Sequence, residues 1–212
     1  MPQKWLNGSV FQAAIVVKEN RQSPSDKGYI TLGIEANITS NQNLTDYINS
    51  RTIALNSLLE NTTSIFDAIV TFKAPVSQAD FESWGEASVE KYGGFVAIFT
   101  DQKTGNQTSS VVYSKPDEEG YIPDLTKWQE GFKFEGVLAV ECRLTPYQAR
   151  NLLSDEKTLL IDPYEDLQTR QIEERYESTG LTAQVERTLT EEVWTHHTQM
   201  IIEPQATQKE VP

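Results

Sequence analysis

The stretch that most constrains the fold of this chain is residues 137–163, VLAVECRLTPYQARNLLSDEKTLLIDP, where three local patterns agree. It opens with an apolar, valine-rich run (VLAV) that is typical of a buried strand. Thr145 and Gln148, with Pro146 in the first turn, form the capping-box pattern that begins a helix. A second apolar run (LLI) is closed by an Asp-Pro pair. This stretch therefore predicts a strand, a short helix and a second strand.

A similar order of elements comes before it. Residues 65–72 are predicted to form a buried strand, stopped by a proline. Ser77, with an acidic residue three positions later, is the predicted cap of a helix whose apolar face ends at Tyr92. Residues 93–94 are a glycine pair, the pattern of a left-handed cap at a helix end. Residues 95–100 then return as a strand.

The segment between these two units is read as an insertion. Residues 101–136 carry a polar turn, a short strand at 110–113 and a loop. Residues 63–166 as a whole therefore give strand, helix, strand, insertion, strand, helix, strand, which is the split βαβ or ferredoxin-like order. We expect an α+β fold in which helices cover one face of an antiparallel sheet.

The preceding residues, 1–62, are expected to form a ββα extension of this domain. The apolar stretches 10–18 and 28–36 are predicted to pair as a hairpin. The helix that follows is predicted to be capped by Thr45 or Asn43.

The last part of the chain, residues 167–212, is expected to form a charged helix and an extended arm. The arm contains Trp194 and several aliphatic residues among many polar ones. Because these apolar side chains need cover, the arm is predicted either to pack on its own domain or to swap onto a second copy, which would make a homo-oligomer.

The charge and composition of the chain exclude several classes of function. It has 212 residues and a formal net charge of −13, which repels phosphate backbones, so nucleic acid is not an expected partner. No window approaches the run of about 18 apolar residues that a membrane helix requires. Five Asn-x-Ser/Thr sequons indicate a surface that faces outside the cytoplasm; their asparagines are Asn7, Asn37, Asn43, Asn61 and Asn106.

The search for catalytic and metal-binding residues gives no constellation. Cys142 follows an apolar strand, where a buried structural role is expected. His196 and His197 are adjacent, so in a strand their side chains point to opposite faces. The acidic run 117–119 lacks the alternating ligand spacing of a calcium loop, and no glycine-rich phosphate loop is present. We therefore expect no enzyme, no cofactor and no metal.

Two stretches resemble a known family. IVTFKAPVSQADFESWGEASVEKYGG and LTPYQARNLLSDEKTLLIDPYED are similar to the two halves of the subtilisin-propeptide-like inhibitor family, across residues 65–166. The resemblance implies that the sheet packs against a protease and that the segment after the last strand enters the substrate cleft. The insertion and the ββα extension depart from the family pattern, and the 212 residues include no protease domain. The partner-binding residues that the resemblance implies are Pro163, Tyr164, Glu165, Asp166 and Leu167.

These observations lead to one expected function and two alternatives. We expect a non-enzymatic protein-binding domain, outside the cytoplasm, that binds a partner protein through its sheet or through the segment after the last strand. The first alternative is an inhibitor or folding chaperone of a subtilisin-type serine protease. The second is a structural or assembly protein that uses its C-terminal arm.

Overall fold

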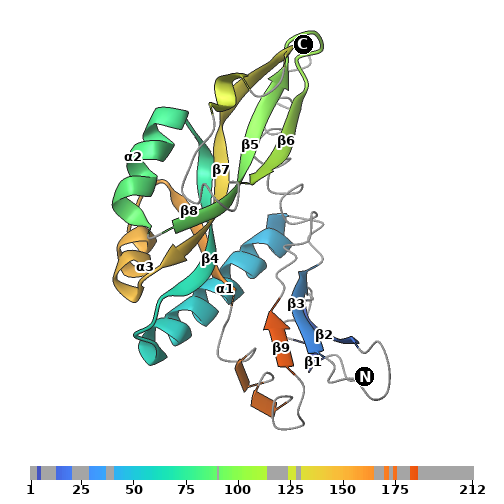
Figure 1. Ribbon diagram of the computed structural model, residues 1–212, viewed down its shortest axis with the longest axis vertical. Helices are drawn as coiled ribbons and strands as arrows, with labels where there is room; N and C mark the ends of the chain where they lie inside the picture. Colours follow the sequence, from blue (N-terminus) through green and yellow to red (C-terminus); the bar gives the residue numbers. More distant parts are fainter. Residues whose placement is uncertain are drawn as a thin grey trace. The chain divides into compact units, whose positions relative to one another are not determined.

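The chain folds into two compact units, residues 59–163 and a second unit formed by Met1–Leu58 with Tyr164–Pro212. We call them the central unit and the terminal unit. The computed structural model describes residues 4–5, 13–20, 29–36, 41–89, 91–113, 124–127, 130–164, 170–171, 174–175 and 182–185. Figure 1 labels the helices and strands of both units.

The central unit is an α+β domain, as expected, and it is built on one five-stranded sheet. The strands lie in the order β6-β5-β7-β4-β8, and every neighbouring pair is antiparallel. Helices α2 and α3 lie beside each other along the sheet (Figure 1). The elements are β4 (Phe66–Val76), α2 (Gln78–Ser88), β5 (Lys91–Asp101), β6 (Gln107–Tyr113), the 3-10 turn η1 (Leu125–Lys127), β7 (Phe132–Leu144), α3 (Pro146–Leu153) and β8 (Thr158–Pro163).

The two helices of the central unit begin where the sequence predicts. The Ser77 hydroxyl accepts a hydrogen bond from the backbone N–H of Asp80, 3.2 Å away. The Thr145 hydroxyl accepts from the Gln148 N–H at 3.2 Å, and the Gln148 side chain accepts from the Thr145 N–H at 2.8 Å. In each cap, a side chain accepts a hydrogen bond from a backbone N–H group that has no partner within the helix. Both caps join residues only three positions apart, so the sequence shows them directly.

The predicted end of α2 is wrong. The helix stops at Ser88, and the residue after it, Val89, is already extended. Tyr92 pairs with β7 as part of β5, and Gly93 is the extra residue at a shift in that pairing. Neither Gly93 nor Gly94 has a positive φ, so they are not a helix cap. The hydrogen bonds that β5 forms with β7 along this stretch account for the early end of the helix.

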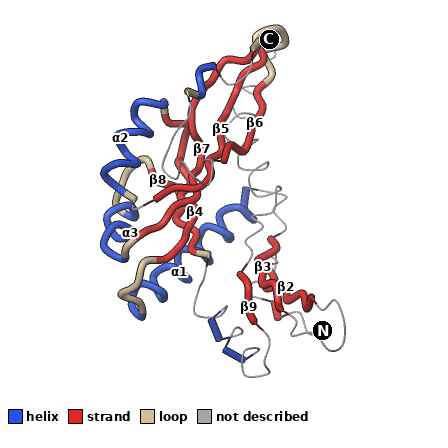
Figure 2. The backbone as a smooth tube through the Cα atoms, in the orientation of Figure 1, coloured by secondary structure: helices blue, strands red, loops and turns tan. Residues whose placement is uncertain are grey.

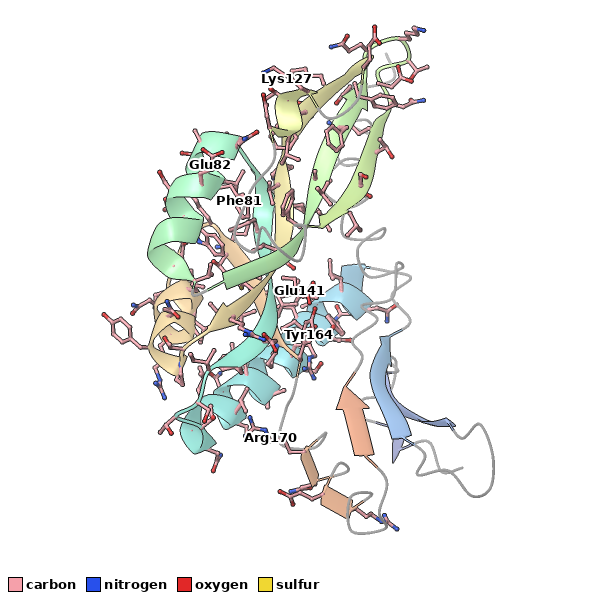
Figure 3. The ribbon with its side chains drawn as sticks, viewed as in Figure 1. Phe81, Glu82, Lys127, Glu141, Tyr164 and Arg170 are labelled. Carbon is pink, nitrogen blue, oxygen red and sulfur yellow. The ribbon has the colours of Figure 1, made fainter. Side chains whose placement is uncertain are left out.

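Aromatic packing attaches α2 to the sheet. Phe81 and Trp84 on the helix stack with their ring centroids 5.9 Å apart. Phe72 of β4 meets Trp84 edge-on at 5.0 Å, and Phe95 of β5 lies 5.9 Å from Phe81. Figure 3 shows Phe81 on the side of α2 that faces the strands. The apolar face of α2 is therefore part of the core rather than an exposed binding platform.

The terminal unit contains the predicted hairpin. Strands β2 (Ala13–Asn20) and β3 (Tyr29–Ala36) pair antiparallel without a shift. β1 (Lys4–Trp5) adds to β2, and β9 (Thr182–Val185) pairs parallel with β3. Four residues of the predicted arm thus pack on their own chain, whereas Trp194 lies outside the described residues.

Helix α1 (Asn41–Asn61) begins earlier than predicted. Asn43 and Thr45 both lie inside it, so neither is its N-terminal cap, and that prediction is wrong. The helix carries a buried stripe at helical spacing, which includes Leu44, Tyr47 and Leu55. Asn43 is itself 5% exposed, so the residue predicted to cap the helix is a buried residue within it.

Candidate protein-binding edge

The segment predicted to bind a partner begins at the end of β8. Pro163 is the last residue of that strand and is buried, and Tyr164 is half-buried. Both already take part in interactions of the folded chain, and Figure 3 labels Tyr164. Glu165, Asp166 and Leu167 lie outside the described residues.

The residues considered for catalysis or metal binding give no site in the described part of the chain. Cys142 lies in β7 and is 3% exposed. Burial raises the pKa of its thiol well above the ordinary value, and the carboxylates of Asp67 and Glu141 raise it further. The thiolate is therefore disfavoured, as expected for a structural cysteine. His196, His197 and the acidic run 117–119 are not among the described residues, and within the described ranges no three His, Cys, Asp or Glu side chains gather as metal ligands.

Strand β6 is the most accessible part of the sheet. It lies at the end of the strand order, and no described strand pairs with its outer side. Its sequence, QTSSVVY, contains no charge, no proline and no glycine. Its pairing with β5 runs from Gly94–Tyr113 to Thr100–Gln107 without a shift. Natural sheet edges are usually blocked by charges, prolines or bulges, and β6 has none of these features.

The pairing of β6 determines which backbone groups face outward. At the start of the hairpin, the Asp101 N–H donates to the Asn106 carbonyl at 2.8 Å. Inward-facing and outward-facing residues alternate along an antiparallel strand. The N–H and C=O groups of Gln107, Ser109 and Val111 therefore point away from β5. These groups therefore have the geometry needed to form hydrogen bonds with an additional strand.

The turn before β6 holds the strand in place. The Asp101 carboxylate accepts hydrogen bonds from the backbone N–H groups of Lys103, at 2.7 Å, and Thr104, at 3.2 Å. These two bonds lower the pKa of Asp101 below its ordinary value. Gly105 has φ +71°, and its N–H donates to the Asp101 carbonyl at 2.8 Å, which is the geometry of a glycine bulge after a tight turn. The Gln102 N–H also donates to the Gly131 carbonyl at 2.9 Å.

The side chains of β6 divide between the core and the surface. Val112 is 1% exposed and pairs with Phe95, which itself packs on α2. Val111 is 51% exposed and pairs with the buried Val96. One valine thus anchors the strand, while its neighbour offers an apolar side chain beside the outward-facing backbone.

Sequence reasoning found only part of this edge. It predicted a short strand at 110–113, but β6 begins at Gln107. The signal in the sequence is the uncharged run QTSSVVY after a turn, although only the strand order shows that this run forms an edge.

Comparison of the chain with protein-family models, curated proteins and solved structures gave no match. In the described ranges, no helix has both the length and the apolar composition needed to cross a membrane. The geometry of the chain is thus the basis for any assignment of function.

Proposed function

We propose that the central unit is a non-enzymatic protein-binding domain that receives an extended segment of another protein as an added strand on β6. The observation that carries this proposal is the edge strand β6, which pairs with no described strand on its outer side and is mostly exposed, uncharged and regularly paired on its inner side. In strand addition, main-chain hydrogen bonds supply affinity and alternate side chains supply specificity.

The chemistry of the edge defines what the partner contributes. Gln107, Ser109 and Val111 each offer one N–H and one C=O, and each bond formed contributes about 1 kcal/mol net. Val111 adds an apolar contact on one face of the strand. Since ordering a free segment costs about 1–2 kcal/mol per residue for the backbone alone, the partner segment is expected to be held extended by its own protein.

The net charge favours a different protein over a second copy as the partner. Each chain carries a net charge of −13, so two copies repel each other at low ionic strength. No charged side chain on β6 offsets that repulsion. A neutral or basic partner segment meets no such barrier.

A labelled, uncharged peptide of alternating Thr and Val residues, cyclised so that it is held extended, tests the proposal. We expect saturable binding by fluorescence anisotropy, with increased protection of the 107, 109 and 111 amides from hydrogen exchange. Ser109→Pro removes one outward-facing N–H and is expected to weaken binding about tenfold. The matched control, Ala79→Pro, alters an exposed position in the first turn of α2 and is expected to bind normally. Absence of binding, or equal binding by Ser109→Pro, would count against strand addition.

The second candidate is an inhibitor or folding chaperone of a subtilisin-type protease. Without β6, the strand order is β8-β4-β7-β5, with α2 joining β4 to β5 and α3 joining β7 to β8. This order supports a split βαβ domain with β6 as an added edge strand, and hence the resemblance noted for residues 65–166.

Inhibition of a subtilisin-type protease by the full chain at micromolar concentration tests this candidate. Truncation of the chain after Pro163 would abolish inhibition if the following segment enters the cleft. Unchanged protease activity with the intact chain would exclude this function. The peptide-binding assay is independent of that result, so the two candidates are separable.

A further inference from the structure

Three of the five sequons have their asparagine among the described residues, and these asparagines differ in exposure and in secondary structure. Asn43 lies inside α1 and is 5% exposed. Asn61 is exposed, but it is the last residue of α1 and takes part in an interaction. Asn106 is exposed and lies between the β5–β6 turn and the start of β6. A glycan is bulky and requires a surface position, so the three sites are not equivalent acceptors.

The surroundings of Asn106 leave its side chain accessible. Its backbone is held on both sides: its carbonyl accepts from the Asp101 N–H at 2.8 Å, and its N–H donates to the Thr104 hydroxyl at 3.3 Å. Its carboxamide forms no hydrogen bond to any described residue. Thr108, the hydroxyl residue of the sequon, is also exposed. The Asn-Gln-Thr sequon is thus presented in non-helical backbone with both of its defining side chains in solvent.

We propose that Asn106 is an acceptor site for an N-linked oligosaccharide. The carboxamide nitrogen of Asn106 forms a bond to C1 of a sugar carried on a lipid phosphate. The bond between C1 and the phosphate oxygen breaks, and the electron pair leaves with the lipid phosphate. The proton lost by the carboxamide passes to a base of the transferase. The co-reactant is therefore a lipid-linked oligosaccharide, and no oxidation or reduction takes place.

This site is independent of the proposed function but lies next to it. Asn106 directly precedes Gln107, the first outward-facing residue of β6. A glycan at this position would shield the start of the edge without occupying its hydrogen-bonding groups.

The test uses the folded full chain, a purified oligosaccharyltransferase and a lipid-linked oligosaccharide. Short peptides that contain each sequon are treated in parallel. Peptide mapping of the folded chain is expected to show occupancy at Asn106 at least about tenfold above that at Asn43, because Asn43 becomes accessible only when α1 opens. Asn61 is expected to fall between them. In the peptides, the difference between the Asn43 and Asn106 sequons should disappear.

Two variants complete the test. Thr108→Ala is expected to abolish modification of Asn106 and to leave Asn61 unchanged, while Thr108→Ser retains modification. Because Thr108 is exposed, both variants are expected to keep the melting temperature of the parent chain. The proposal is overturned if the transferase modifies the Asn106 peptide but not the folded chain. It is also overturned if neither the peptide nor the folded chain is modified at Asn106.

Discussion

The two edge strands of the central sheet, β8 and β6, differ in burial, in residue type and in the regularity of their pairing. At one edge, β8 is buried along most of its length and includes Asp162, which is 1% exposed, and Pro163, which has no N–H to offer. Its pairing with β4 is also shifted between Thr71 and Phe72. At the other edge, β6 is mostly exposed, uncharged and evenly paired. Figure 2 shows β6 beside β5 at this edge of the sheet.

This difference indicates that β8 is protected against pairing with a further strand, whereas β6 is not. An inward-pointing charge, a proline and an irregular register are devices that natural sheets use against edge-to-edge pairing. β8 has a buried acidic residue, a proline and a shifted register, whereas β6 has none of these features. Both edges belong to one sheet of one chain, so the overall composition and net charge of the protein do not explain this contrast. The contrast therefore supports a specific role for β6.

The largest expected effect comes from two neighbouring valines of β6. Val112→Asp places a carboxylate in the core against Phe95 and is expected to lower the free energy of unfolding by about 3 kcal/mol or more. Val111→Asp adds the same group at a half-exposed position and is expected to cost less than about 1 kcal/mol. Urea denaturation measures both changes. Equal losses would contradict the division of β6 into a core side and a free side.

Prolines at adjacent positions test which backbone groups are already paired. Ser110→Pro removes an N–H that points toward β5 and is expected to cost about 3 kcal/mol, whereas Ser109→Pro removes an outward-facing N–H and is expected to cost about 1 kcal/mol. Thermal unfolding monitored by circular dichroism provides the comparison. A larger loss for Ser109→Pro would reverse the assignment of the outward-facing residues.

The turn that positions β6 contributes less. Gly105→Ala places a side chain at φ +71°, where nothing lies within 4 Å of the added carbon, so the cost is conformational only. The expected loss is about 1 kcal/mol, accompanied by faster hydrogen exchange in β6. Gly105→Asn, which tolerates this conformation better, serves as the control and is expected to lose less. If Ala and Asn are equivalent, the left-handed backbone at Gly105 is not what holds the edge.

The smallest effect is a dependence on pH. The pKa of Asp101 is lowered in the folded chain by the N–H groups of Lys103 and Thr104. A lowered folded-state pKa stabilises the fold above the ordinary pKa of the group, near 3.8, and this contribution is lost as the pH falls through the folded-state value. Asp101→Asn is expected to reduce the loss of protection of the Lys103 and Thr104 amides below that pH. Hydrogen exchange between neutral pH and acid measures it, and identical profiles for parent and variant would contradict this role.

The features that the sequence predicts correctly, namely the starts of two helices and the strands of the central unit, are those that depend on local patterns. Thr145 with Gln148, and Ser77 with Asp80, begin helices through hydrogen bonds that span three residues, so the sequence shows them directly. The order of the strands along the chain of the central unit was predicted for the same reason, because apolar runs and the alternation of apolar and polar residues are local patterns.

The errors arose where distant pairing overrides a local pattern. The glycine pair after α2 resembles a cap, but hydrogen bonds from β7 draw Tyr92 and Gly94 into β5. Likewise, Asn43 has the residue type of a cap, yet it is buried within α1. A single sequence does not show either partner surface, so propensity and capping rules alone chose the wrong boundary.

The sequence by itself determined the order of the helices and strands along the central unit, the N-terminal caps of its helices and the uncharged character of QTSSVVY. Only the tertiary structure decided that this run is an edge, that Val112 is buried while Val111 is half-exposed, and that Asn106 is in solvent while Asn43 is not. The physical reason is that strand order and burial depend on contacts between residues far apart in the chain, which no local pattern encodes.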